Sequence, residues 1–281
     1  MKKLSTPVIL GGILLLSPLA WGSQPGDRDE VHPLLEDKFT FRAGALRNKA
    51  EATFIASRPI LPETELTLNT LGINQTKTTG WLAFSWRFSE RWALNLSYNA
   101  FAVEGGRIVD KDFNFDGVQF AAGADIDTSL RADAWVADVS YSFYKSRNLE
   151  IGAGLGLHAF DFRTDIDTVP FINENSVERG TKSNYEVIAP VPNLRLYGRL
   201  ALSNRTAIDI ESGLLSLSYD EWSGEFFYIS SRLEYRFKNS IGVGIGYQLT
   251  DIDLEEARDF GRRHVYDVKF NGTMLYMTYS Y

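Results

Sequence analysis

Apolar and polar residues alternate with a period of two along most of the chain after Phe39. Successive side chains of a β-strand point to opposite faces, so each alternating stretch predicts a strand with one apolar and one polar face. Ten segments carry the pattern, at residues 39–45, 82–88, 92–98, 135–143, 149–157, 194–202, 208–214, 229–237, 241–247 and 275–281. No stretch after Phe39 offers a sustained helical period, so the pattern predicts an all-β fold.

The alternation is clearest in the eighth segment, at residues 229–237, and weakest in the seventh, at residues 208–214. In the eighth, one face holds Ile229, Leu233, Tyr235 and Phe237, and the other holds Ser230, Arg232, Glu234 and Arg236. The weak pattern at 208–214 leaves eight or twelve strands as alternatives to ten. Alternation alone does not separate a soluble sandwich from a membrane barrel, because both classes show it.

The connections between segments separate these two classes. Four connections are short and polar, at residues 89–91, 145–148, 203–205 and 238–240. Others are predicted to be long polar loops, at residues 105–130, 165–183 and 251–263, with 220–224 as a short exception. Short turns on one side and long loops on the other are typical of bacterial outer-membrane barrels.

Aromatic residues on the apolar faces gather near the short turns and the chain end. The set comprises Trp86, Phe88, Trp92, Tyr141, Phe143, Tyr235, Phe237, Tyr279 and Tyr281. In a soluble sandwich these rings would fill a core, and nothing would collect them at one end of each strand. They predict an aromatic girdle at one membrane interface.

The last strand carries a family resemblance. Residues 273–281 read Thr-Met-Leu-Tyr-Met-Thr-Tyr-Ser-Tyr, with an aromatic last residue and another two positions before it. Together with the pattern over 39–281, this strand resembles the single-chain outer-membrane β-barrels of Gram-negative bacteria. The resemblance implies a closed antiparallel up-and-down barrel in the cell outer membrane, with both termini periplasmic and the last strand recognised by the barrel assembly machinery. The chain departs from the usual pattern at Tyr276, where glycine is common; the nearest glycine is Gly272.

The first residues predict export. Residues 1–22 combine Lys2 and Lys3 with an apolar run, and small residues at Ala20 and Gly22 fit a cleaved signal peptide. A membrane anchor is the alternative, but the run is too short to span hydrocarbon. Residues 23–38 are expected to be an extended periplasmic lead-in, and 39–281 the barrel. Cleavage removes two lysines, which leaves 27 basic against 36 acidic residues, a net charge of −9.

This charge argues against nucleic acid as a partner, because phosphates require a basic face. The chain has no cysteine, so neither disulfides nor thiolate metal sites contribute to its stability. No cofactor is expected. We expect a monomer in contact with outer-membrane lipid and lipopolysaccharide.

If the apolar faces meet lipid, the polar faces line the lumen. They carry Arg42, Arg87, Asp138, Glu150, Arg195, Arg199, Asp209, Glu211, Arg232, Glu234 and Arg236. Small barrels are filled by their own side chains, and buried charges must be paired, so we expect an ion-pair network that plugs the lumen. Glycines at 152, 154, 156, 242, 244 and 246 are expected to make room for arginines of neighbouring strands. The function predicted is structural, or interaction through the long loops; a narrow porin-like channel for small solutes is the main alternative.

A hydrolase acting on lipid or surface protein is the second alternative. It needs a base beside a nucleophile or activated water. Only His158 and His264 lie in the predicted barrel, and His158 faces inward with Asp161 and Asp165 close in sequence. A histidine among charges is more often a network member, and the His-x-Ser of barrel lipid deacylases is absent. We therefore assign no catalytic residue.

An Asp-Ile-Asp motif recurs three times. Its carboxylates are Asp125, Asp127, Asp165, Asp167, Asp251 and Asp253, all at outward positions above the predicted apolar belt. Carboxylate oxygens suit hard divalent cations, which also bridge lipopolysaccharide phosphates, so these residues are candidate metal ligands. A solvated acidic face is the plainer interpretation.

Overall fold

A computed structural model describes residues 31–281, except 59–60, 70–72, 109–112, 116–117, 121, 169–171, 174–175, 178–181, 220–221, 239 and 259–261. One short helix, α1, spans Pro33–Glu36. The strands of the main sheet are β1 (Phe39–Arg58), β2 (Leu61–Thr67), β3 (Thr76–Arg87), β4 (Trp92–Ile108), β7 (Asp125–Lys145), β8 (Leu149–Thr168), β11 (Lys182–Ala201), β12 (Thr206–Tyr219), β13 (Trp222–Lys238), β14 (Ile241–Arg258) and β15 (Arg262–Ser280). Two small hairpins are formed by β5 (Phe113–Phe115) with β6 (Val118–Phe120) and by β9 (Ile172–Asn173) with β10 (Ser176–Val177).

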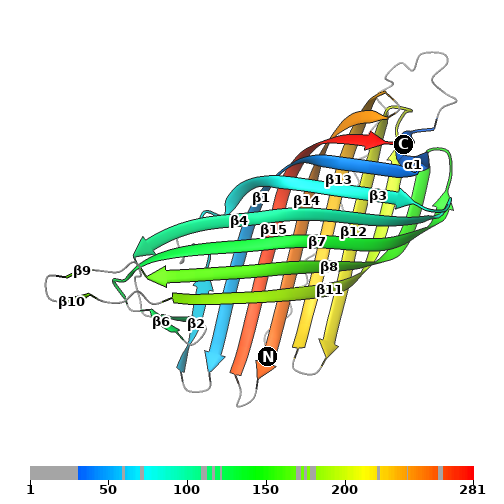
Figure 1. Ribbon diagram of the computed structural model, residues 1–281. Coiled ribbons are helices and arrows are strands. Elements are labelled where there is room, and N and C mark those ends of the chain that lie inside the picture. The colour runs from blue at the N-terminus through cyan, green and yellow to red at the C-terminus, as the bar shows by residue number, and fades with distance from the viewer. Residues whose placement is uncertain are drawn as a thin grey trace, which may run out of the picture. The chain divides into compact units, whose positions relative to one another are not determined.

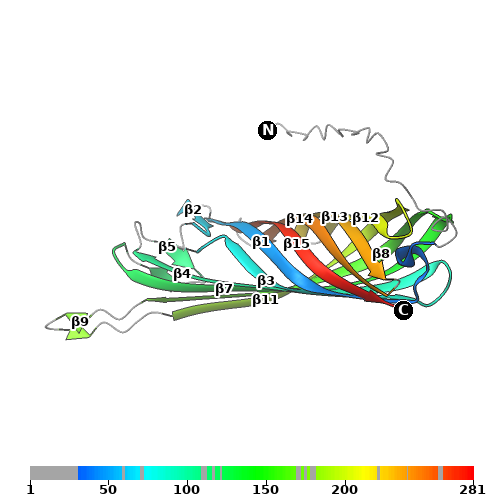
Figure 2. The ribbon, with the colours of Figure 1, turned by 90° about the horizontal axis from the view of Figure 1, so that it is seen from above.

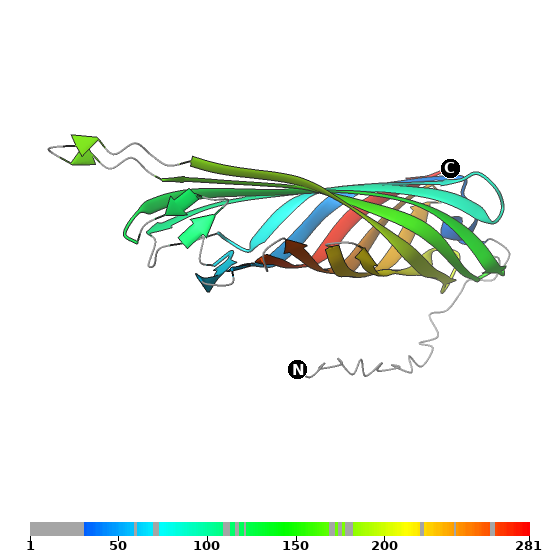
Figure 3. The ribbon, with the colours of Figure 1, turned by 90° about the horizontal axis from the view of Figure 1, so that it is seen from below.

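Ten strands close into an antiparallel up-and-down barrel. Figure 1 shows the strands of the two walls. Each strand pairs with its sequence neighbours, and β15 pairs with β1 from Thr40↔Ser280 to Ser57↔Arg263. The short strand β2 adds to the edge of β1 beyond β3. Figures 2 and 3 show the two walls of the barrel crossing in projection. The predicted fold class and the count of ten are confirmed, and the weak segment at 208–214 lies in β12.

The prediction of long irregular loops is wrong for much of its length. β7 begins at Asp125, β8 runs to Thr168, and β14 and β15 are joined across residues 259–261. These polar segments are strand extensions, because their backbone groups continue the barrel ladder. We call the end of the barrel with the short connections, where α1 and Tyr281 lie, the turn end, and the opposite end the far end.

The interior changes character from one end to the other. In the turn half, outward side chains are apolar and inward ones polar; in the far half, this order reverses on the same strand. On β14, Ile245 is exposed and Gly246 buried, whereas further along Ile252 is buried and Asp253 exposed. The far half therefore has an interior apolar core like that of a soluble barrel.

The lead-in is helical at residues 33–36, so the prediction of an extended segment is wrong there. Pro33 is at the first helical position, where its missing N–H costs nothing. The ring of His32 caps the helix by accepting a hydrogen bond from the Leu34 amide over 3.1 Å. Leu34 and Leu35 are buried, so apolar contact holds the segment at the turn end. In the described part of the chain, no helix has the length and apolar character to cross a membrane.

Candidate functional site: the barrel lumen

Charged side chains fill the turn half of the lumen. All eleven residues that the alternation placed inward lie there and make ion pairs. The closest approaches are Arg42–Glu234 at 3.1 Å, Arg87–Glu150 at 2.9 Å, Arg195–Asp138 at 3.1 Å, Arg199–Glu150 and Arg199–Asp209 at 3.7 Å, Arg232–Asp209 at 2.7 Å, Arg232–Glu211 at 2.9 Å and Arg236–Glu234 at 2.7 Å, with Arg195–Glu211 also in contact. Their pairing offsets the cost of removing each charge from water.

Glu234 pairs with only one of the two arginines that flank it on its own strand. Spacing along β13 places it between Arg232 and Arg236, but it pairs with Arg236 and with Arg42 of β1. Arg232 instead reaches Asp209, directly opposite on β12. The curvature of the barrel brings β1 and β13 within side-chain reach, and a single-strand argument cannot see this.

Hydroxyl groups complete the network; alternation placed Ser142 and Tyr197 on the polar faces but did not predict their part in the network. Tyr197 lies between Arg195 and Arg199, with each guanidinium 4.9 Å from the ring centre. Its hydroxyl lies 2.8 Å from Ser142 Oγ, and Ser142 donates to Glu150. The sequence carried a signal for this contact, because Tyr197 is an aromatic residue on the polar face of its segment, between Arg195 and Arg199.

The inward glycines lie against several kinds of neighbouring group. A Cβ at Gly242 or Gly246 would meet the stem of an arginine, as expected. At Gly152 and Gly244, however, a Cβ would meet the ring of Tyr197 or Tyr276 within 2.4 Å. Gly154 lies against the backbone of Val139 and Ser140, and Gly156 lies against the Asn193 amide. Of the six inward glycines, arginine is therefore the neighbour at two only, Gly242 and Gly246.

The far half of the lumen is packed with apolar side chains. This apolar cluster comprises Ala50, Ala52, Leu68, Ile73, Phe101, Val103, Ile126, Leu130, Ala132, Phe160, Ile166, Val191, Phe226, Tyr228, Ile252, Val268 and Phe270. The central isoleucine of each Asp-Ile-Asp motif belongs to it, and Ile126, Ile166 and Ile252 are at most 3% exposed. The motif therefore marks a strand that faces water on one side and a core on the other.

A cavity of about 110 Å³ lies between the charges and the apolar cluster. Its lining includes Arg232, Tyr228, Phe270 and His158. The His158 ring lies 2.8 Å from the Asn193 amide nitrogen and packs against Tyr228. An amide and aromatic rings surround this histidine, so the described contacts supply it with no nucleophile. The side chain of His264 lies outside the described residues.

The nine girdle residues are all exposed on the outer wall near the turn end. Several contact one another, as in Trp92–Tyr141, whose ring centres are 5.0 Å apart. A second aromatic pair, Tyr98–Trp135, lies further along β4 and β7 at 4.3 Å, and outward charges such as Arg131 follow it. On β4 and β7, aromatic pairs therefore lie at both ends of the exposed apolar stretch.

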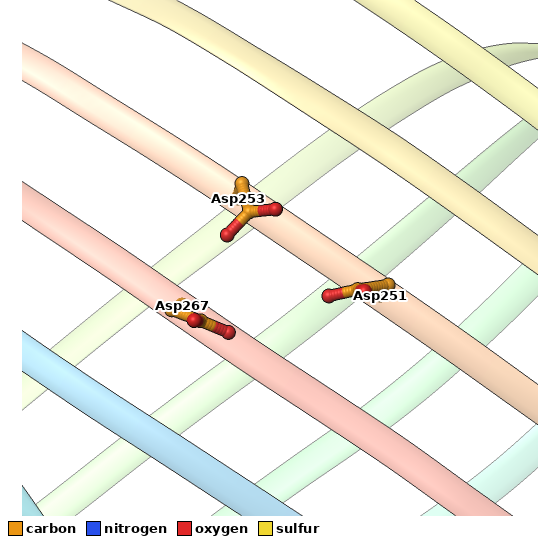
Figure 4. A group of neighbouring side chains, drawn as sticks. All are labelled: Asp251, Asp253 and Asp267. Carbon is orange, nitrogen blue, oxygen red and sulfur yellow. The ribbon is translucent and has the colours of Figure 1, made fainter. Parts of the chain in front are cut away.

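The six motif aspartates do not come together as one group. Asp127 lies opposite Asp167 across β7 and β8. Within the described residues, the one group of three carboxylates within 4.8 Å joins Asp251 and Asp253 of β14 to Asp267 of β15, as Figure 4 shows. Lys269 Nζ lies 3.2 Å from Asp267 Oδ1 and so supplies a positive charge. Metal binding by these residues stays a prediction.

Comparisons with known proteins agree with this architecture. No family model matches the chain, and no curated protein sequence does. Among solved structures, the outer membrane protease OmpT from Escherichia coli aligns over 86% of this chain and 96% of its own, with a TM-score of 0.56 and 8% identity. OprG from Pseudomonas aeruginosa aligns over 90% and 97%, with a TM-score of 0.38 and 11% identity. At such identity the likeness to OmpT concerns the fold and not the activity. The chain has the fold of the single-chain outer-membrane β-barrels.

Proposed function

We propose that this protein is a closed, non-conducting barrel of the outer membrane that acts through the strand extensions at its far end. The observation that carries the proposal is the doubly filled lumen. Ion pairs occupy the turn half and the apolar cluster occupies the far half. A barrel filled in this way offers no continuous water path, in contrast to the open lumen of large porins.

The orientation follows from the class. The turn end would face the periplasm and the far end the outside, because long segments of such barrels are extracellular. The outward aspartates and lysines of the extensions would then meet lipopolysaccharide headgroups and an external partner. Recognition of the Tyr279–Tyr281 end by the assembly machinery, and the monomeric state, belong to the same proposal. Density-gradient separation of membranes tests the location; a soluble mature protein without detergent would contradict it.

Planar-bilayer recording tests the closed lumen. The full chain is expected to give no reproducible single-channel steps. Reproducible steps would favour the narrow channel, provided that they come through this lumen. Ser230→Cys decides that point, since Ser230 is buried, faces inward and lines the cavity, and the chain has no native cysteine. Steps that a charged thiol reagent blocks in Ser230→Cys but not in the outward-facing Ser231→Cys would overturn the proposal.

The hydrolase alternative has no described nucleophile beside His158. Mass analysis of lipid A and of surface proteins, with and without the gene, tests it directly. No difference in either is expected.

A further inference from the structure

The barrel wall is unpaired along one line at the far end. β11 and β12 pair only from Leu194↔Leu214 to Ala201↔Ala207. Beyond that point, β11 continues with β8 alone and β12 continues with β13 alone. We call this stretch, residues 182–193 of β11 and 215–219 of β12, the seam. Figure 1 shows the two strands diverging there, and among described residues no other strand pairs with either edge.

Two prolines account for the seam. The Ala201 amide donates towards β8 and the Leu202 amide towards β12, so even-numbered nitrogens of β11 face β12. Because the pairing of β11 with β8 continues without a register shift, the same alternation of amide direction holds as far as Pro190 and Pro192. Both nitrogens therefore face β12 without a hydrogen to donate. The ladder ends where the next two bonds cannot form.

The outer border of the seam is apolar. Leu155 and Ile188 are 73% and 64% exposed. Leu194 and Leu214 form the last pair before the seam, and both side chains are exposed. The rings of Pro190 and Pro192 are also exposed. Lipid hydrocarbon would therefore contact the seam directly.

The inner border is apolar as well. Val191 of β11 and Phe226 and Tyr228 of β13 belong to the apolar cluster, and Leu215 of β12 packs against it. The neighbouring cavity of about 110 Å³ has Tyr228 in its lining. The opposite side of that cavity is lined by Arg195, Asp209 and Arg232, so the cavity marks the boundary at which the apolar cluster meets the charge network.

We propose that the seam is a lateral portal through which one hydrocarbon chain of an outer-membrane lipid inserts into the apolar cluster. The proposal rests on the membrane location proposed above and goes beyond the closed lumen. The lumen stays closed, because the charge network in the turn half stops the hydrocarbon chain. An extended peptide adding as a strand is the competing occupant. It is disfavoured because Pro190 and Pro192 remove two donors from the edge that such a peptide would use.

Photo-crosslinking tests the proposal. p-Benzoylphenylalanine is placed at Phe226, beside the seam, in the full chain reconstituted in dioleoylphosphatidylcholine vesicles. The same probe at Leu155 reports the outer wall, and at Phe101 it reports the opposite side of the apolar cluster. Phospholipid adducts are expected at Leu155 and Phe226 and not at Phe101. Labelling at Leu155 without labelling at Phe226 would overturn the portal.

Closing the seam supplies the matched comparison. Pro190→Val with Pro192→Val restores two donors opposite Ser218 and Ser216, and closure is read as slower hydrogen exchange of those two serine amides. The adduct at Phe226 should then fall at least tenfold, while the adduct at Leu155 stays. Leu194→Val, at an already paired position, should change neither.

A disulfide across the seam provides a second way to close it if the valines do not. Pro192→Cys with Ser216→Cys compares oxidised and reduced states of one sample in a chain with no other cysteine. Equal adducts in both states would overturn the proposal, and so would a polypeptide adduct at Phe226 in whole cells. Because the charge network is untouched, these variants leave the conductance test of the closed lumen independent.

Discussion

Glu234 on β13 accepts a hydrogen bond from Arg42 on β1 over 3.1 Å, and this contact ties together strands that are 192 residues apart in sequence. Arg236 donates to the same carboxylate over 2.9 Å. The pair shows how the lumen is organised: carboxylates from one wall neutralise arginines from another. Removing the Glu234 carboxylate therefore leaves Arg42 and Arg236 without the counter-charge that both contact.

Glu234→Gln should destabilise the barrel by about 3 to 5 kcal/mol, because two buried guanidinium groups lose their counter-charge. Urea unfolding in lipid vesicles measures the change. Glu51→Gln is the control, since Glu51 pairs with Lys49 on the exposed surface and should have no measurable effect. Equal effects of the two variants would mean that the lumen is hydrated.

Leu233→Arg should destabilise the folded state in lipid by about 2 to 4 kcal/mol, because the outward Leu233 lies in the apolar belt. Glu225→Arg, outward on the same strand but beyond the belt, should be tolerated. Folding yield in vesicles, read from the shifted gel mobility of folded barrel, compares the two. Tolerance of Leu233→Arg would reverse the inside and outside assignments.

Ile252→Ala should cost about 2 to 5 kcal/mol, because it opens a hole in the apolar cluster. Ile245→Ala removes the same atoms from the same strand where the residue is 52% exposed on the outer wall, so its effect should be less than half as large. Unfolding free energies in vesicles test the difference. A larger loss for Ile245→Ala would contradict the reversal of faces along β14.

Ser212→Pro should destabilise the barrel by about 1 to 3 kcal/mol, because Ser212 is paired with Leu196 and its amide faces β11. Ser216→Pro changes the same residue type on the same edge of β12, within the seam, and should leave stability unchanged. Thermal unfolding of both variants measures this. Similar losses would show that β12 is paired at Ser216 after all.

The docking of α1 should weaken in acid. Burial lowers the pKa of His32 from about 6.5 to about 4, so only the undocked segment takes up a proton between these values. Stability of the docked state should fall by up to about 3 kcal/mol as the pH drops from 6.5 to 4, and then level off. Hydrogen exchange of the Leu34 and Leu35 amides across this range reports it. His32→Asn keeps a capping oxygen without the imidazole titration and should remove this loss of stability.

Sequence alternation located all ten barrel strands because lipid and lumen impose opposite demands on neighbouring residues. It failed beyond the belt for a physical reason. Around Ile126 and Ile252 the outward residues are aspartates. Strands were recognised by outward apolar residues, so these segments were predicted to be loops. An isoleucine between two aspartates is itself alternation, with the apolar face turned inward.

The lumen charges were predictable one by one but not as pairs. Parity along each strand places Arg232 and Glu234 inside, yet their partners depend on barrel curvature and on side chains from strands far away in sequence. The seam was equally hidden, although Pro190 and Pro192 are visible in the sequence. Which edge a proline nitrogen faces depends on the register with both neighbouring strands.

The reversal of faces along each strand also bears on how the chain tolerates mutation. On the turn side of the reversal, odd positions of β14 such as Ile245 are apolar and exposed; on the far side, even positions such as Ile252 are apolar and buried. We expect each of these sets to accept only apolar side chains. One strand thus obeys two opposite substitution rules, and the switch occurs within a few residues. A variant library of β14 would locate the boundary of the apolar belt directly, as the position at which the requirement for an apolar side chain moves from odd to even residues.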